Sequence, residues 1–208
     1  MFDFNPLDLI AGIPGLIIAM VIHEYAHARV AVALGDRTPM LMGRLTLNPA
    51  AHIDPVGLIM LFLVRFGWAK PVIIDPRNFR KPRRDDILVS LAGPAANLVT
   101  AFLALVVLLV LKSTMGHLSF GVYQVFQLII IYNINFAIFN LIPLPPLDGS
   151  HVLMQLLPSR MAYSYARLER YSFLILIALI MTPVLSMIFI PLQRLIWQIF
   201  VLLLMPFF

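Results

Sequence analysis

The chain has 208 residues, of which 61% are hydrophobic and only 12% are charged. A soluble domain has roughly half apolar and a quarter charged residues, so this composition excludes an ordinary soluble domain and indicates an integral membrane protein. The absence of cysteine excludes a disulfide, a thiolate metal site and a thiol nucleophile. The formal net charge is +5, but the way it is distributed along the chain argues against nucleic-acid binding.

The apolar residues are gathered in long blocks. Four blocks come close to the roughly 20 residues that a membrane-spanning helix needs. They are Ile10–Val32, Ile87–Leu111, Gly121–Ile142 and Tyr171–Ile190. A fifth block, Leu192–Met205, is shorter and predicts either a tilted span or an interfacial helix. Thr182–Pro183 predicts a kink in the C-terminal part.

A sixth block, Val56–Phe66, would reach only about 17 Å as a helix, against roughly 30 Å of hydrocarbon. We therefore expect it to be re-entrant or interfacial. The flanking stretches "MLMGRLTLNPAAHIDPVG" and "WAKPVIIDP" carry strand and turn signals, which predict a small β-hairpin or sheet at the cytoplasmic membrane edge. An edge strand there would suit pairing with an extended peptide. The predicted fold is an all-α polytopic membrane protein with about five to six hydrophobic segments.

The charges predict how the chain crosses the membrane. The N-terminal "MFDFNPLDLI" contains Asp3 and Asp8 and no basic residue, so we expect the first block to be a retained span and not a signal peptide. Nine of the 15 lysines and arginines lie between residues 35 and 84, most densely in "RNFRKPRR". Because positive loops stay in the cytoplasm, this places 35–84 inside and the N-terminus outside. We interpret the basic run as an anchor to anionic lipid head groups.

The stretch "VIHEYAHARV" places ionisable residues inside the first apolar block. His23 and His27 are four positions apart and share one helix face, so both imidazoles can point at one ion. Glu24 lies beside them, which gives the H-E-x-x-H pattern of a zinc pair with a general base. Ionisable groups in spans are rare and usually functional. The alternative is that the two histidines only form hydrogen bonds with neighbouring helices.

A catalytic zinc site needs a third protein ligand. Asp148 is the best candidate, because "NLIPLPPLDG" follows a span directly, its prolines end the helix, and Gly149 allows a tight turn. If the short block does not cross the membrane, Asp148 emerges at the same face as the histidines. His151 is the rival ligand, and His52 is predicted to make a structural hydrogen bond in its loop.

These motifs together resemble the site-2 protease family of intramembrane zinc metalloproteases, whose pattern is HExxH followed by N-x-x-P-x-x-x-x-D-G. The second pattern is filled by Asn140, Pro143, Asp148 and Gly149. The stretch "LAGPAANL" resembles the intervening G-x-x-x-N element of the family through Gly93 and Asn97. The likeness runs from about residue 10 to 155.

The resemblance implies one integral membrane protease domain over 1–208, with its motifs in 10–155, C-terminal helices in 171–208, and no PDZ domain. It implies one Zn²⁺ held by His23, His27 and Asp148, with Glu24 as the base. Asn140 would hold the substrate or stabilise the oxyanion, or it would only cap its helix. Asn97 and Gly93 would contact the substrate backbone or support the site; alternatively, Asn97 only bridges helices and Gly93 only allows close packing.

The implied activity is zinc-dependent hydrolysis of peptide bonds in transmembrane or juxtamembrane segments, near the cytoplasmic face of the cell membrane. The expected partners are membrane-protein substrates and membrane lipid, and no nucleic acid. Assembly of the chain into a homo-oligomer is left as an alternative to a monomer. The alternative is a non-catalytic metal-binding membrane protein or a transporter. A transporter would need polar residues across both leaflets, whereas the ionisable residues of the spans lie at one depth. An inactive relative would usually have lost Glu24.

Overall fold

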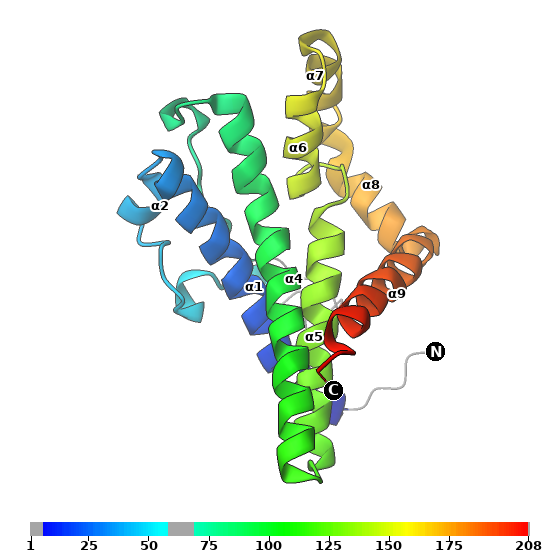
Figure 1. The fold of residues 1–208 in the computed structure, drawn as a ribbon. Coiled ribbons are helices and arrows are strands. Elements are labelled where there is room, and N and C mark those ends of the chain that lie inside the picture. Colours follow the sequence, from blue (N-terminus) through cyan, green and yellow to red (C-terminus); the bar gives the residue numbers. More distant parts are fainter. Residues whose placement is uncertain (1–5, 58–68, 208) are drawn as a thin grey trace.

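The regular structure of the chain is helical in the computed structural model, which describes residues 6–57 and 69–207 (Figure 1). Its long helices are α1 (Pro6–Leu34), α4 (Pro82–Met115), α5 (Phe120–Asn140) and α9 (Val184–Leu204). In the described part, these four are long and apolar enough to cross a membrane. The shorter elements are α2 (Thr38–Leu41), η1 (Pro49–Ala51), η2 (Pro76–Asn78), α6 (Asp148–Leu156), α7 (Ser159–Ala166) and α8 (Glu169–Met181). The prediction of a helical polytopic protein is thereby confirmed in outline.

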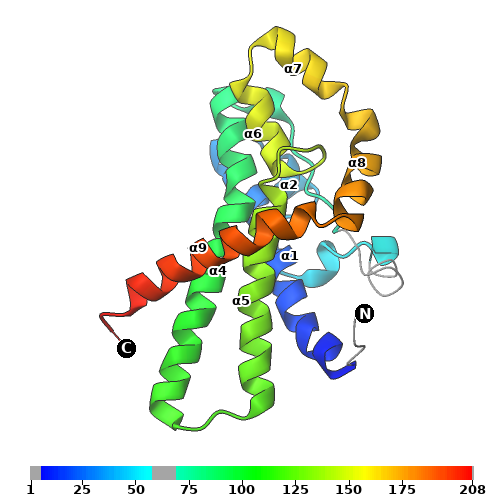
Figure 2. The same ribbon diagram turned by 90° about the vertical axis from the view of Figure 1, so that its right-hand side faces the viewer.

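Helices α4 and α5 form an antiparallel hairpin, and α1 packs against both (Figures 1 and 2). The two helices of the hairpin pack at small residues of α4, Ala101 and Ala104, which let the larger side chains of α5 approach closely. Helix α9 crosses the hairpin obliquely and contributes Phe200 and Leu204 to the same apolar cluster. Direct contacts of α1 with α4 and α5 hold the "HEYAH" stretch against the hairpin.

The C-terminal part differs from the prediction. Tyr171–Ile190 is not one span: α8 ends at Met181 and α9 begins at Val184. The break falls at the predicted kink, where Pro183 cannot continue the hydrogen bonding of α8. Helix α8 has 13 residues and reaches only about 20 Å, too short to span alone. The block Leu192–Met205 instead belongs mostly to the 21-residue helix α9.

The predicted β-hairpin is not confirmed. Within residues 41–57 and 69–81, the structure has turns, η1, η2 and one isolated antiparallel bridge between Ile53 and Ala69. The side chains of Asn48 and Asp75 accept hydrogen bonds from backbone N–H groups two residues on, which favours turns over a strand ladder. The predicted re-entrant block Val56–Phe66 lies almost entirely outside the described residues.

Asp36, just after α1, forms hydrogen bonds with α2 and with residues 75–78. Its fully buried carboxylate accepts hydrogen bonds from the backbone and hydroxyl of Thr38, from the Asp75 N–H at 2.8 Å and from the Asn78 amide at 2.8 Å. Burial raises the pKa of Asp36, but these hydrogen bonds outweigh it and hold the pKa below its ordinary value. One carboxylate thus joins α1, α2 and the segment that leads into η2.

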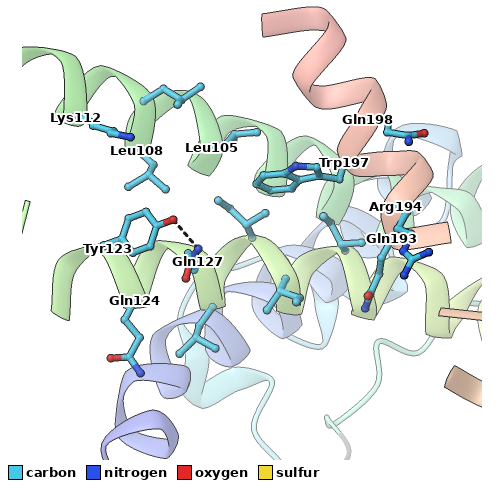
Figure 3. Close-up of a pocket in the computed structure, with 15 residues that line it drawn as sticks. Leu105, Leu108, Lys112, Tyr123, Gln124, Gln127, Gln193, Arg194, Trp197 and Gln198 are labelled. Carbon is cyan, nitrogen blue, oxygen red and sulfur yellow. Dashed lines mark hydrogen bonds between the residues drawn. The ribbon is translucent and has the colours of Figure 1, made fainter. Parts of the chain in front are cut away.

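A groove of about 750 Å³ lies between α4, α5 and α9, towards the turn that joins α4 to α5 (Figure 3). Its walls are aliphatic, including Leu105 and Leu108, and Lys112, Gln127 and Arg194 lie around it. Helix α6, which begins with Asp148, lies at the opposite end of the hairpin (Figure 2). The groove is therefore separate from the polar cluster described next.

Candidate metal centre

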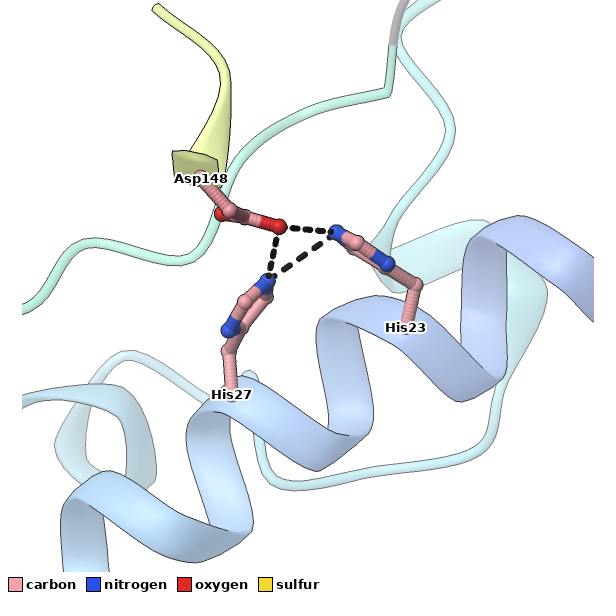
Figure 4. A group of neighbouring side chains, drawn as sticks. All are labelled: His23, His27 and Asp148. Atoms are coloured by element: carbon pink, nitrogen blue, oxygen red, sulfur yellow. Dashed lines mark hydrogen bonds and ion pairs between the residues drawn. The ribbon is translucent and has the colours of Figure 1, made fainter. Parts of the chain in front are cut away.

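Two distant parts of the chain meet at three side chains. His23 and His27 lie one turn apart on α1, and Asp148 begins α6 (Figure 4). Asp148 Oδ2 is 3.1 Å from His23 Nε2 and 3.3 Å from His27 Nε2, and the two Nε2 atoms are 3.0 Å apart. Both histidines are buried, and the aspartate side chain is only 18% exposed. The sequence prediction that these three residues converge agrees with this geometry.

The hydrogen bonds on the far side of each ring set the tautomers. His27 Nδ1 lies 2.7 Å from the carbonyl oxygen of Val89, which only accepts, so Nδ1 carries the hydrogen. His23 Nδ1 lies 2.8 Å from Asn97 Oδ1, and the amide nitrogen of Asn97 donates to Asn133 at 3.0 Å. The oxygen of Asn97 therefore faces His23, whose Nδ1 also carries the hydrogen. In both neutral rings, Nε2 presents a lone pair to Asp148.

Three lone-pair atoms facing one another repel unless a cation lies between them. Asp148 Oδ2 is buried and has no hydrogen-bond donor among the described residues. Tetrahedral zinc with bonds of about 2.0–2.1 Å separates its ligands by about 3.3 Å, close to the distances found here. The donor set and its spacing therefore fit a tetrahedral metal ion.

Two glycines make room for the cluster. A Cβ atom on Gly93 would lie 2.5 Å from His27 Nε2 and 2.6 Å from His23 Cε1, so a side chain there would displace the imidazoles. A Cβ atom on Gly149 would overlap the carbonyl oxygen of Leu141, so glycine lets the start of α6 return against the end of α5. Gly93 thus leaves the space that the two imidazoles occupy. Its contact with substrate stays a prediction.

Asn97 contacts His23 at Nδ1, the ring nitrogen that faces away from Asp148. It is fully buried on α4, accepts from His23 Nδ1, and donates to the carbonyl oxygen of Ala19 on α1 at 2.8 Å. Asn133 extends this chain to α5, because it accepts from Asn97 and donates to Ile129 O at 2.8 Å. This network is consistent with the supporting role considered for Asn97, and the substrate contact stays a prediction.

Glu24 is held by a backbone donor that the sequence did not reveal. Its Oε2 accepts a hydrogen bond of 2.9 Å from the N–H of Val72, in the segment before η2. This segment is fixed at one end by Lys70 N–H, which donates to His52 O at 2.8 Å, and at the other by the Asp36 carboxylate. A backbone N–H has no side-chain signature, so only the folded chain identifies Val72 as the partner of Glu24.

Asn140 lies at the end of α5 and bonds to its own helix. Its amide nitrogen donates to the carbonyl oxygen of Phe136 at 2.9 Å. This contact lies within α5, and the capping alternative considered from the sequence stays a prediction. A primary amide has two N–H groups, so a second donor remains for a substrate oxygen, and the oxyanion role of Asn140 stays a prediction.

The rival ligands lie outside the cluster. His151 is half exposed, and its Nδ1 is 3.9 Å from Asp86 Oδ2. His52 is fully buried and its Nε2 bonds to the carbonyl oxygen of Thr46 at 2.8 Å, as predicted for a structural loop histidine. Among the described residues, the group able to hold a metal consists of His23, His27 and Asp148.

The fold and the cluster define a helical membrane protein with a buried group of side chains that could hold a metal ion. The model of peptidase family M50 matches residues 115–183 of the chain. Over 195 residues, the chain is 38% identical to the Bacillus subtilis protein "Putative zinc metalloprotease YwhC", covering 91% of this chain and 89% of that protein. The chain therefore belongs to peptidase family M50, which confirms the resemblance to the site-2 proteases.

The chain is also similar to two further curated proteins. The chain is 29% identical over 180 residues to "Putative zinc metalloprotease Rip2" of Mycobacterium tuberculosis, covering 84% of this chain and 68% of that protein. It is 26% identical over 194 residues to "Stage IV sporulation protein FB" of Bacillus subtilis, covering 93% of this chain and 56% of that protein. No solved structure gave a significant match. With its four long apolar helices, the chain is a multi-pass membrane protein of this family.

Proposed function

We propose that the chain is a zinc-dependent endopeptidase that hydrolyses peptide bonds in transmembrane or juxtamembrane segments of membrane proteins. The observation that carries this proposal is the meeting of two imidazole Nε2 atoms and Asp148 Oδ2, within 3.0–3.3 Å of one another, beside Glu24. The zinc metalloprotease names of the relatives YwhC and Rip2 support it.

His23, His27 and Asp148 would hold the zinc ion and leave a coordination position free for chemistry, as catalytic zinc sites do. When bound, zinc supplies a Lewis acid that polarises a carbonyl group and makes water more acidic. The hydrogen bonds to Val89 and Asn97 keep both Nε2 atoms directed at this point. Gly149 lets the first turn of α6 pack against the end of α5, where a Cβ atom would overlap the carbonyl oxygen of Leu141.

Glu24 would act as the general base. It would take a proton from the attacking water and later deliver it to the leaving amine. The Val72 N–H holds one carboxylate oxygen of Glu24 in place. The second N–H of Asn140 would donate to the oxyanion that develops on the scissile carbonyl.

Substrate binding has to expose carbonyl groups that a helix hides in its own hydrogen bonds. An extended substrate needs an extended partner, and the segment beside Glu24 offers one. Ile73 follows Val72 directly and is 53% exposed, and its backbone N–H and C=O make no hydrogen bond with the described residues. We assign pairing with the substrate backbone to this segment, in place of the edge strand expected from the sequence.

The basic loop residues between 35 and 84 support a cytoplasmic location for this side of the protein, with the N-terminus outside. In that orientation the metal centre opens towards the cytoplasmic face, where water for hydrolysis is available. The proposed function is compatible with either a monomer or a homo-oligomer.

Exchanging Glu24 for glutamine tests the function directly. Membranes with wild type or Glu24→Gln are compared by mass spectrometry for fragments of membrane proteins, and zinc is measured in both purified proteins. The proposal predicts that Glu24→Gln keeps its zinc but loses the fragments. A variant that still produces the same fragments would exclude Glu24 as the base, and with it this mechanism. A transporter or a passive metal binder would show no fragments that depend on wild type.

A further inference from the structure

The position of Asp148 depends on how a very short helix docks. Helix α6 has nine residues, and helices of this length are unstable alone, so its orientation comes from tertiary contacts. It packs on the first part of α4 (Figures 1 and 2). His151 follows Asp148 by three residues and Gln155 follows His151 by four, so the three side chains share one face of α6.

The other end of that face meets a buried carboxylate on α4. Asp86 is 6% exposed, and Gln155 Nε2 donates to its Oδ2 at 2.7 Å. His151 Nδ1 lies 3.9 Å from the same oxygen. Among the described residues, the Asp86 carboxylate makes no other hydrogen bond. A buried carboxylate without partners is costly, so any rotation of α6 that removes Gln155 is opposed.

We propose that Asp86 is a positioning residue of the metal centre, a proposal that rests on the proposed function. It acts through Gln155, with His151 nearby, to set the rotation of α6 on α4 and so hold Asp148 opposite the two histidines. Gln155 lies about 10 Å along the helix from Asp148. Gly149, packed against Leu141, fixes the near end of α6, and Asp86 fixes the far end.

The neighbour of Asp86 provides a matched control. Asp85 is equally buried, at 3% exposure, and carries the same charge on the same turn of α4. Its carboxylate accepts from the Lys81 N–H at 2.9 Å at the start of its own helix, and no hydrogen bond or ion pair links it to α6. Loss of Asp85 therefore disturbs α4 without releasing Gln155.

The test is binding of Co²⁺ to the purified full chain, freed of metal and held in detergent. The visible spectrum of cobalt reports the number and type of its ligands, and a titration gives the affinity. We expect Asp86→Leu to weaken cobalt binding by about 10–100-fold and to change the spectrum, as loss of supporting contacts does at metal sites. Asp86→Asn keeps an acceptor for Gln155 and should restore the wild-type spectrum. Asp85→Leu should lower thermal stability but keep the spectrum.

A double variant shows whether the two residues act through one contact. Gln155→Leu added to Asp86→Leu should weaken cobalt binding no further than Asp86→Leu alone. The proposal is overturned by a wild-type spectrum and affinity in Asp86→Leu, or by an equal loss in Asp85→Leu. A wild-type chain that binds no cobalt would overturn the proposed function and this positioning role together, whereas normal binding by Asp86→Leu overturns the positioning role alone.

Discussion

Replacing Asn97 by leucine removes the partner that holds His23 in its tautomer while keeping a similar side-chain volume. Three hydrogen bonds are lost: to His23 Nδ1 at 2.8 Å, to Ala19 O at 2.8 Å and to Asn133 Oδ1 at 3.0 Å. Hydrogen bonds between membrane helices contribute about 0.6 kcal/mol each, so we expect a loss of about 2 kcal/mol in unfolding free energy. The freed imidazole should also bind zinc about 10–100-fold more weakly.

The assay is a zinc competition titration with a chelator, run beside thermal unfolding of the same detergent-solubilised protein. Thr100→Val is the matched control, because Thr100 lies one turn further along α4 and donates only to Ala96 O within its own helix. It should leave the zinc affinity unchanged. If Asn97→Leu binds zinc as tightly as wild type, Asn97 does not orient His23 and the account of the network is wrong.

Three further changes give distinct expected results. Gly93→Ala places a methyl group about 2.5 Å from the imidazoles and should lower bound zinc at least tenfold, measured by metal analysis. Val72→Pro removes the N–H that holds Glu24 and should slow cleavage about tenfold at unchanged zinc content; a loss of bound zinc in Val72→Pro would contradict this. Asp36→Asn should lower the free energy of unfolding by about 2–3 kcal/mol at neutral pH. Because the folded pKa of Asp36 is lowered, its stabilisation is complete above its ordinary value of 3.8 and disappears as pH falls through the folded pKa. The difference in melting temperature between wild type and Asp36→Asn should therefore shrink at acid pH. A difference that stays constant with pH would refute the stabilising role of the ionised Asp36 carboxylate.

Local spacing was enough to predict that two of the three side chains of the cluster lie together. His23 and His27 lie four residues apart in an apolar helix, and this spacing fixes their common face before any tertiary structure is known. Asp148 required more: the charge distribution had to bring two distant segments to the same membrane face. The structure places the three atoms within 3.3 Å of one another.

The remaining contacts depend on backbone geometry that side-chain patterns do not encode. The Val72 N–H could not be singled out from the sequence, because every residue except proline carries such a donor. The strand prediction failed because Asn48 and Asp75 cap turns with their own side chains. Pro183 marked the break between α8 and α9 correctly, but hydropathy alone joined the two helices into one span.

X-ray absorption spectroscopy at the zinc edge of the purified chain tests the central claim most directly. The account predicts one zinc ion per chain, with scattering from two imidazoles and an oxygen ligand at about 2.0–2.1 Å. Replacing Asp148 by alanine should remove or remodel the signal. A chain that retains no zinc, or a zinc signal without imidazole scattering, would contradict the account.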